Sequence, residues 1–384
     1  MSNDSVIIEA NRPALPQPPD QPAGVCEVSI SCHDAVPPSL EAELVQLYHH
    51  MNSSLCHYAV ARRARKACAY VARRGEHPQA IFLFEREGSS IVVFNEMMQL
   101  TAEEIERFAR AMFSRFPSVA RISFSKIGKD IGTLSLPWQQ YGNAEDIVVS
   151  LPDTPDAYLS RLGSKLRHNI RHQTKAICAE FPSFLFETYE NAAIQENHVA
   201  GLIELKKANM EEKRIKFGIT PEEAAWMLEC AKNNGLLVVA LLDGQVCGGS
   251  LSFRLGDHYF SHLNGYDPRF AKYSLGMLCC YLAVKEQIQR GAKEAHLLWG
   301  RNPYKFKLLG VPRDMANLDI YRSRVQYYRY FSRVVRNALD DFVAEQKQML
   351  LENERRNGFL PSLLGRAVKI MRTIKRANFR PTSG

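Results

Sequence analysis

Residues 236–310 constrain the fold more than any other part of the chain. Three apolar, β-rich runs are joined there by the dipeptides Asp243-Gly244 and Gly256-Asp257. Both pairs tolerate the backbone angles of a tight turn, so the pattern predicts two successive β-hairpins. A helix is expected over residues 274–290 and a short strand over residues 295–299. The stretch therefore predicts a β-meander that leads into a helix and a further strand.

The predicted helix begins with Ser274, Leu275, Gly276 and Met277. The N–H groups of a first helical turn have no partner within the helix, and the helix dipole favours negative charge there. The missing Cβ at Gly276 lets a phosphate approach the backbone. We therefore expect these four residues to bind the phosphates of a ligand. The alternative is an ordinary helix start that Ser274 caps.

Several motifs follow one another in a recognisable order. They are Ser164-Lys165-Leu166-Arg167 through Arg171, Gly265-Tyr266-Asp267-Pro268, Ser274-Leu275-Gly276 and Gly300-Arg301-Asn302-Pro303-Tyr304-Lys305. Together they resemble the core of the GCN5-related N-acetyltransferases (GNAT), and within them the branch of CelD-like proteins and Fem peptidyltransferases. The resemblance covers roughly residues 150–325 and implies an α/β fold with a mixed sheet. The family's pyrophosphate loop, Arg/Gln-x-x-Gly-x-Gly/Ala, keeps only its last glycine here, which leaves the identity of the donor open.

The first half of the chain repeats this order of elements in miniature. Residues 39–74 have a helical pattern, and residues 80–85 and 90–95 predict a hairpin. Residues 101–116 predict a helix with a capping box formed by Thr101 and Glu104, and a strand is expected over residues 119–124. The resemblance implies tandem GNAT-like domains, the first degenerate. We place them at residues 25–150 and 151–325, between a disordered segment, 1–24, and a C-terminal helix and tail, 326–384.

The basic charge of the chain is concentrated at its end. The net charge is +8, and residues 355–384 contain eight lysines and arginines and no acid, so residues 1–354 balance to zero. A neutral body argues against a generic nucleic-acid binder. Residues 361–377 predict an amphipathic helix with leucine, isoleucine and methionine on one face and basic residues on the other. This helix fits an anionic membrane surface, and equally an acidic partner such as an acyl carrier protein or the body of the protein itself.

The cysteines and the hydropathy pattern indicate a cytoplasmic protein. The nine cysteines form no Cys-x-x-Cys pair, which favours reduced thiols. The longest clean apolar run, 236–242, is too short to span a bilayer, and the N-terminus lacks the features of a secretory signal. We therefore expect a cytoplasmic location, with peripheral contact at the inner face of the membrane through the tail. His168 and His172 have metal-ligand spacing without a third ligand, so no metal is expected.

Acyl transfer to an amine requires a donor site, a proton acceptor and a polarised carbonyl. His258 and His262 share one face of the same predicted strand, and His262 is the candidate general base because histidine titrates near neutral pH. Asp267 is the rival base. The alternatives are a hydrogen-bonded packing histidine and an aspartate that begins an Asp-Pro turn.

The resemblance assigns further roles near the expected cleft. Tyr304 is placed to protonate the departing thiolate or to bind substrate, and Lys305 to hold an anionic group. Arg167 and Arg171 lie on the basic face of a helix over residues 156–178 and are candidates for binding an acidic acceptor or the donor's phosphates. A solvated lysine and a solvated basic face are the alternatives.

The leading hypothesis is an N-acyltransferase that moves an acyl group directly from acyl-CoA to a small-molecule, saccharide or peptide amine. Cell-envelope or polysaccharide metabolism would suit the tail. The second hypothesis is a Fem-type peptidyltransferase that uses aminoacyl-tRNA as donor, although the neutral body speaks against such a ligand. The third is a non-catalytic, membrane-associated scaffold of the same fold, favoured by the eroded pyrophosphate loop.

Overall fold

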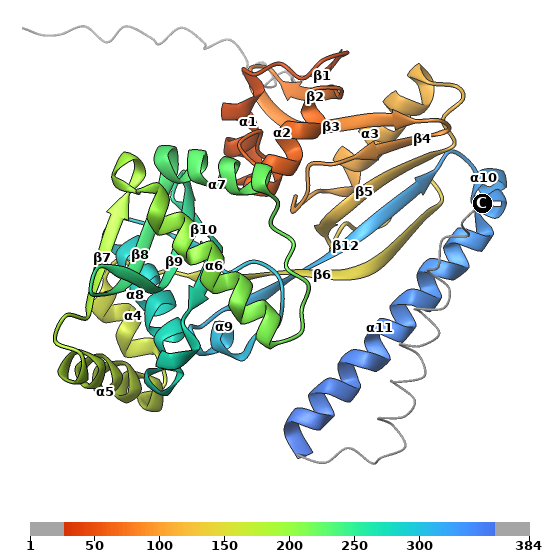
Figure 1. Ribbon diagram of the computed structural model, residues 1–384. Coiled ribbons are helices and arrows are strands. Elements are labelled where there is room, and N and C mark those ends of the chain that lie inside the picture. The colour runs from red at the N-terminus through yellow and green to blue at the C-terminus, as the bar shows by residue number, and fades with distance from the viewer. Residues whose placement is uncertain (1–26, 358–384) are drawn as a thin grey trace, which may run out of the picture.

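One twelve-stranded mixed sheet runs through the computed structural model, which describes residues 27–357 (Figure 1). Neighbouring strands follow the order β1-β2-β3-β4-β5-β12-β6-β11-β10-β9-β8-β7. The strands are β1 (Val28–His33), β2 (Cys68–Arg74), β3 (His77–Glu87), β4 (Ser90–Val93), β5 (Arg121–Gly128), β6 (Trp138–Ser150), β7 (Leu185–Glu190), β8 (Gly235–Leu242), β9 (Gln245–Leu255), β10 (His258–Tyr266), β11 (Glu294–His296) and β12 (Val311–Tyr321). The predicted fold class, an α/β protein with a mixed sheet, is confirmed.

The same motif occurs twice in this sheet. In the first half β3 and β4 are antiparallel, α3 (Ala102–Arg115) follows, and β5 returns parallel to β4. In the second half β9 and β10 are antiparallel, α8 (Leu275–Gln289) follows, and β11 returns parallel to β10. The tandem arrangement expected from the order of elements is therefore present in the fold.

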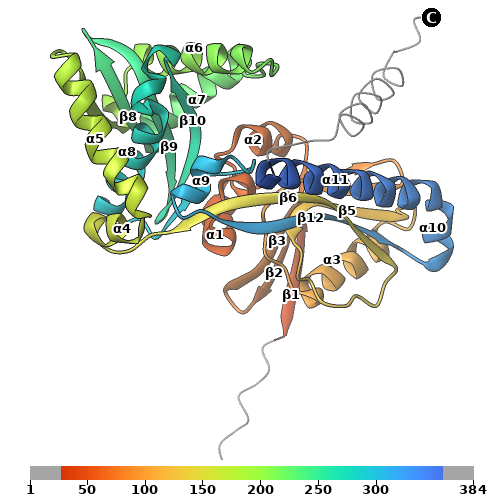
Figure 2. The ribbon, with the colours of Figure 1, turned by 90° about the horizontal axis from the view of Figure 1, so that it is seen from below.

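Two long strands join the halves. β6 pairs with β12 along most of its length and with β11 at its C-terminal end, while β12 also pairs with β5. Figure 2 shows β6 and β12 running side by side from the helices of one half to those of the other. Because both strands contribute to both halves, the two repeats share one continuous sheet.

Helices cover the sheet and bury separate cores in the two halves. A cluster around Phe82, Phe108 and Phe124 fills the first half, and in the second half α8 packs residues such as Leu278 and Val284 against the sheet. Each such side chain contributes roughly 1.5–3 kcal/mol through burial. The remaining helices are α1 (Leu40–Tyr48), η1 (Met51–Ser53), α2 (Tyr58–Ala64), α4 (Pro155–Arg161), α5 (Ser164–Glu180), η2 (Asn191–Ala193), α6 (Glu196–Glu212), α7 (Pro221–Asn234), η3 (Pro268–Tyr273), α9 (Pro303–Lys307), α10 (Arg324–Arg329) and α11 (Phe331–Asn357).

Two of the expected helices are corrected. The helical pattern over residues 39–74 ends at α2, and its last part forms β2, where Ala69, Tyr70, Val71 and Ala72 are buried on both faces of the sheet. A continuous run of apolar residues has no alternation of apolar and polar positions, so its sequence does not distinguish a strand from a helix. The single helix expected over residues 156–178 is divided into α4 and α5, because Leu162 takes an extended conformation between them.

Among the described residues, no helix has the length and apolar character needed to cross a bilayer. The segment expected to be disordered, 1–24, lies outside the described residues, and so does the amphipathic tail segment 361–377.

Candidate functional site

A cavity of about 480 Å³ lies at the end of β10, where this strand and β11 have stopped pairing. The two strands are paired only along His258–Phe260 and Glu294–His296, so the remaining part of β10 is free on this side. Five elements (α6, β10, η3, α8 and α9) and the loops beside them supply the lining residues: Lys206, Asn209, Met210, Lys213, Ile215, Asn264, Gly265, Tyr266, Ala271, Ser274, Leu275, Gly276, Met277, Cys280, Asn302 and Tyr304. A ligand in this space touches the meander, the start of α8, α6 and α9.

The start of α8 faces this cavity. The four residues predicted to bind phosphate, Ser274, Leu275, Gly276 and Met277, all line it. Ser274 has a left-handed backbone with φ 54°, and its side chain makes no capping hydrogen bond. The side-chain cap considered as the alternative is thus absent. The N–H of Met277 bonds to the carbonyl of Ser274 at 2.9 Å, so the N–H groups suited to an anion are those of Leu275 and Gly276.

Gly276 has a packing role that the sequence did not reveal. A Cβ at this position would lie 2.7 Å from the ring of Tyr266, which also lines the cavity. Gly265 permits a second close approach, since a Cβ there would lie 3.0 Å from the backbone of Lys206 in α6. The two glycines therefore bring Tyr266 against the start of α8, and α6 against β10.

Helix α6 adds positive charge to the cavity wall. Asn209 fixes the helix by bonding both backbone groups of Tyr266, donating to its carbonyl at 2.8 Å and accepting from its N–H at 3.1 Å. Lys206 and Lys213 both line the cavity. Burial lowers the pKa of Lys206, whereas Lys213 is exposed. Two ammonium groups opposite an uncapped helix start suit a ligand that carries phosphates.

Tyr304 and Cys280 supply proton-bearing groups at the cavity. Burial raises the pKa of the Tyr304 phenol well above its usual value, so the phenol is protonated at neutral pH. Burial also raises the pKa of Cys280 to about 12, and its Sγ lies 3.7 Å from Oδ1 of Asn264. Tyr304 is thus a neutral hydrogen-bond donor in a half-buried position.

His262 and Asp267 do not line the cavity. A β-bulge interrupts the pairing of β10 with β9 between Ser261 and Leu263, and His262 is the extra residue. Its ring lies between those of Trp226 and Phe253, with centroids 5.4 Å and 5.0 Å away. Burial lowers the pKa of His262 to about 4, so the ring is neutral at physiological pH.

Asp267 has the turn role that was weighed against catalysis. Its carboxylate accepts a hydrogen bond from the N–H of Arg269 at 2.9 Å and pairs with the Arg269 guanidinium. The hydrogen bond from this guanidinium lowers the pKa of Asp267. These contacts begin η3, the short helix that leads to the cavity wall.

The predicted substrate-binding cations lie elsewhere. Lys305 is 3% exposed, and its Nζ donates to the carbonyls of Leu298 and Trp299 at 2.9 Å and 2.6 Å. Arg167 donates to the carbonyls of Ser160 and Leu162, which end α4. Arg171 is exposed on α5. Of the substrate-binding and catalytic residues expected from the sequence, Tyr304 is the one that lines the cavity together with the start of α8.

Sequence reasoning missed the contribution of α6. Lys206, Asn209, Met210 and Lys213 follow one another at helical spacing, so they share one face of α6. This spacing was a usable signal, since a helix over residues 194–213 is readable from the sequence. What the sequence did not show is that this face meets β10, because the contact depends on Gly265.

Comparisons with known proteins agree with this fold. Residues 164–306 match the family model of the acetyltransferase (GNAT) domain, which supports an N-acyltransferase. Among solved structures, FemX is similar with a TM-score of 0.51 at 9% identity, over 68% of this chain and 89% of that one. The structure of L-PGS from Bacillus licheniformis gives a TM-score of 0.46 at 14% identity, over 76% and 94% of the two chains. A tandem GNAT protein from the clavulanic acid biosynthesis pathway gives 0.40 at 8% identity, over 77% and 98%.

At 9% identity the likeness to FemX concerns the fold alone. A search of the curated proteins finds no match. The placement within the CelD-like branch remains a prediction from the sequence.

Proposed function

We propose that the cavity beside α8 binds acyl-CoA and that the protein transfers its acyl group to an amine. The observation that carries this proposal is the meeting of an uncapped helix start with Lys206 and Lys213 in one cavity, within the segment that matches the GNAT domain. The pyrophosphate would lie at the first turn of α8 and near the two ammonium groups. The apolar side chains of Met210, Leu275 and Met277 suit the pantetheine arm.

The transfer itself needs no covalent acyl-enzyme. The amine nitrogen attacks the thioester carbonyl carbon, and the resulting tetrahedral intermediate collapses with cleavage of the carbon–sulfur bond. The departing thiolate takes the proton of Tyr304 Oη, and the proton lost by the nitrogen leaves to solvent. Because burial holds the pKa of Tyr304 high, the phenol carries its proton at neutral pH, and after giving it to the thiolate it takes a proton back from water.

A polyanionic donor such as aminoacyl-tRNA is the second candidate. Its support is the exposed basic face of α5, where Lys165, Arg171 and Lys175 point to solvent and do not line the cavity. A donor of this kind would use α5 together with the cavity, whereas CoA would use the cavity alone.

Calorimetric titration of the full chain with acetyl-CoA, a long-chain acyl-CoA and free CoA tests the proposal. Lys206→Met is expected to weaken binding about 10- to 150-fold, because a hydrogen bond to a charged group contributes roughly 1.5–3 kcal/mol. Lys213→Ala is expected to weaken it about two- to fivefold, as befits an exposed charge. Lys207→Ala is the matched control, since Lys207 is exposed on the same helix and does not line the cavity.

Unchanged binding by Lys207→Ala, with losses in the other two variants, would support CoA at this site. Absence of binding for all three compounds would refute the proposal and favour the polyanionic donor. An equal loss of binding in Lys207→Ala would show that α6 attracts the ligand through its overall charge, without a specific site in the cavity.

A further inference from the structure

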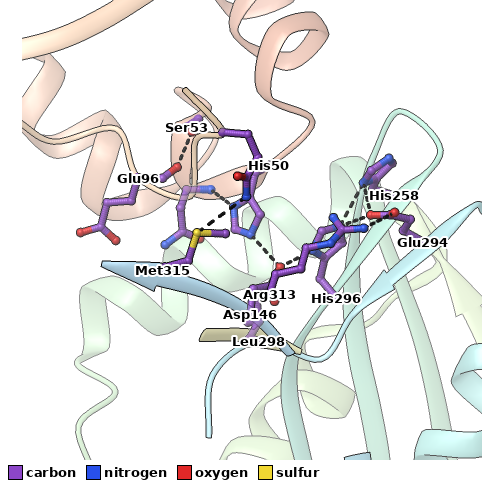
Figure 3. A network of polar contacts seen from close by, with 12 residues as sticks. His50, Ser53, Glu96, Asp146, His258, Glu294, His296, Leu298, Arg313 and Met315 are labelled. Atoms are coloured by element: carbon purple, nitrogen blue, oxygen red, sulfur yellow. Dashed lines mark hydrogen bonds and ion pairs between the residues drawn. The ribbon is translucent and has the colours of Figure 1, made fainter. Parts of the chain in front are cut away.

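Three side chains of the kind that bind metals meet where β10 pairs with β11, in the part of β10 that lies away from the cavity. His258 pairs in register with Glu294, and Phe260 with His296, so that His258, Glu294 and His296 lie on one face of two adjacent strands. Figure 3 shows their side chains converging. We propose that these three residues bind a divalent transition-metal ion of the zinc type.

The distances between the donor atoms fit such an ion. Nδ1 of His258 lies 2.9 Å from Nε2 of His296, and Oε2 of Glu294 lies 3.6 Å and 3.5 Å from these two nitrogens. A triangle with these sides has a circumscribed circle of radius about 1.9 Å, slightly less than the zinc–ligand distance of about 2.0–2.1 Å. A point just outside their plane therefore lies at zinc–ligand distance from all three atoms.

Glu294 is otherwise left with an unused oxygen. Its Oε1 is paired with Arg313, while Oε2 is buried and has no hydrogen-bond partner among the described residues. The separations of 3.5–3.6 Å from the two histidines exceed those of good hydrogen bonds. A buried carboxylate oxygen without a partner costs free energy, and a bound cation removes this cost.

The remote nitrogens of both histidines face carboxylates. Nδ1 of His296 lies 2.5 Å from Oδ2 of Asp146, which is 1% exposed, and Nε2 of His258 lies 3.4 Å from Oδ1 of Asp257. A carboxylate on the remote nitrogen holds the proton there and leaves the other nitrogen's lone pair free for a metal. This is the arrangement in which histidine ligands of zinc are generally found.

His50 belongs to the same network but is not a ligand. Its Nδ1 accepts the N–H of Asn52 at 3.1 Å, so in the neutral ring Nε2 carries the hydrogen. That nitrogen faces Oδ2 of Asp146 at 3.3 Å. His50 thus helps to hold Asp146 in place. Through Asp146, a residue of the first half supports His296, a proposed ligand from the second half.

A direct hydrogen bond between the two histidines is the competing explanation. It accounts for the separation of 2.9 Å but leaves Oε2 of Glu294 without a partner. The ion accounts for all three separations and for the two outer carboxylates. The sequence predicted no metal because His258 and Glu294 come from different strands and form no spacing motif.

Zinc competition against a chromophoric chelator, with the metal-free full-length chain, tests the site. We expect one equivalent of Zn²⁺ to bind with submicromolar affinity, and Co²⁺ to give the visible bands of a tetrahedral site. His258→Ala and Glu294→Gln are each expected to weaken Zn²⁺ binding at least about 100-fold. Asp146→Asn acts through His296, so we expect a loss of about 10- to 100-fold with the Co²⁺ bands retained.

The double variant His168→Ala/His172→Ala is the matched control. These two histidines are exposed on α5 with stacked rings 5.9 Å apart, and they lie outside the proposed site. Unchanged affinity in this control supports the assignment. Absence of stoichiometric binding, loss of binding in the control, or unchanged affinity in folded His258→Ala and Glu294→Gln would overturn it. Circular dichroism establishes that each variant is folded.

Discussion

Burial beside the cavity raises the pKa of Tyr304, so the phenol keeps the proton that the proposed transfer requires. Tyr304→Phe keeps the ring and removes the proton, so kcat is expected to fall about 10²-fold while donor binding stays close to that of the unchanged protein. Steady-state kinetics with acetyl-CoA and a reactive amine measure the effect. Tyr328→Phe, at an exposed tyrosine outside the cavity, is the control. An unchanged kcat in Tyr304→Phe would remove the tyrosine from the mechanism.

Lys305 predicts an unusual dependence of stability on pH. Burial lowers its pKa from 10.5 to about 8 in the folded protein. Between these two values the unfolded chain binds more protons than the folded one, so this residue makes the free energy of unfolding rise as the pH increases from 8 to 10.5.

Urea unfolding at several pH values, compared between the unchanged protein and Lys305→Met, measures this contribution. We expect the variant to lose the part of the rise that comes from Lys305. Lys307→Met, at an exposed lysine two residues away, should retain it. Parallel pH profiles for the unchanged protein and Lys305→Met would contradict the lowered pKa.

Among the elements, the hairpin between β8 and β9 depends on a left-handed turn. Asp243 and Gly244 have φ values of 52° and 76°. Gly244→Ala is expected to lower the free energy of unfolding by about 1–2 kcal/mol, because a Cβ is unfavourable in this conformation even where space is open. Gly218→Ala is matched to it, since Gly218 also has open space and lies outside the helices and strands without a left-handed backbone.

Denaturant unfolding of both variants gives the comparison. Gly218→Ala should remain within about 0.5 kcal/mol of the unchanged protein. Equal losses at the two glycines would mean that turn conformation does not decide the difference.

Elements with local signals were predictable from the sequence. The capping box of α3 is present, with Thr101 and Glu104 bonded reciprocally, and the Asp243-Gly244 hairpin has the expected turn. β6 was missed because its first part carries Gln139 and Gln140 and is held by the distant β12. Long-range pairing of this kind leaves no period in one strand alone.

The same distinction applies to the candidate site. The start of α8 and Tyr304 lie within one local run of motifs, and both line the cavity. The role expected for His262 assumed an uninterrupted strand, and the bulge at this residue breaks the alternation. The lysines of α6 reach the cavity only through the close approach at Gly265, which a helical period does not reveal.

At the scale of the whole molecule, the shared strands β6 and β12 predict that both halves unfold together. Trp138 packs beside the first core and Trp226 beside the core of the second half. Variants in which Trp299 is replaced and only one of these two tryptophans is retained should therefore show the same midpoint of urea unfolding by fluorescence. Two separate midpoints would show that the halves are independent.

The central claim is that the start of α8 and the lysine face of α6 hold the donor. Amide hydrogen exchange with and without acetyl-CoA tests it most directly, because bound ligand slows local opening. The account predicts slower exchange in segments 264–280 and 206–213, and no change along the exposed face of α5. Slower exchange confined to α5, or none in these two segments at saturating acetyl-CoA, would contradict it.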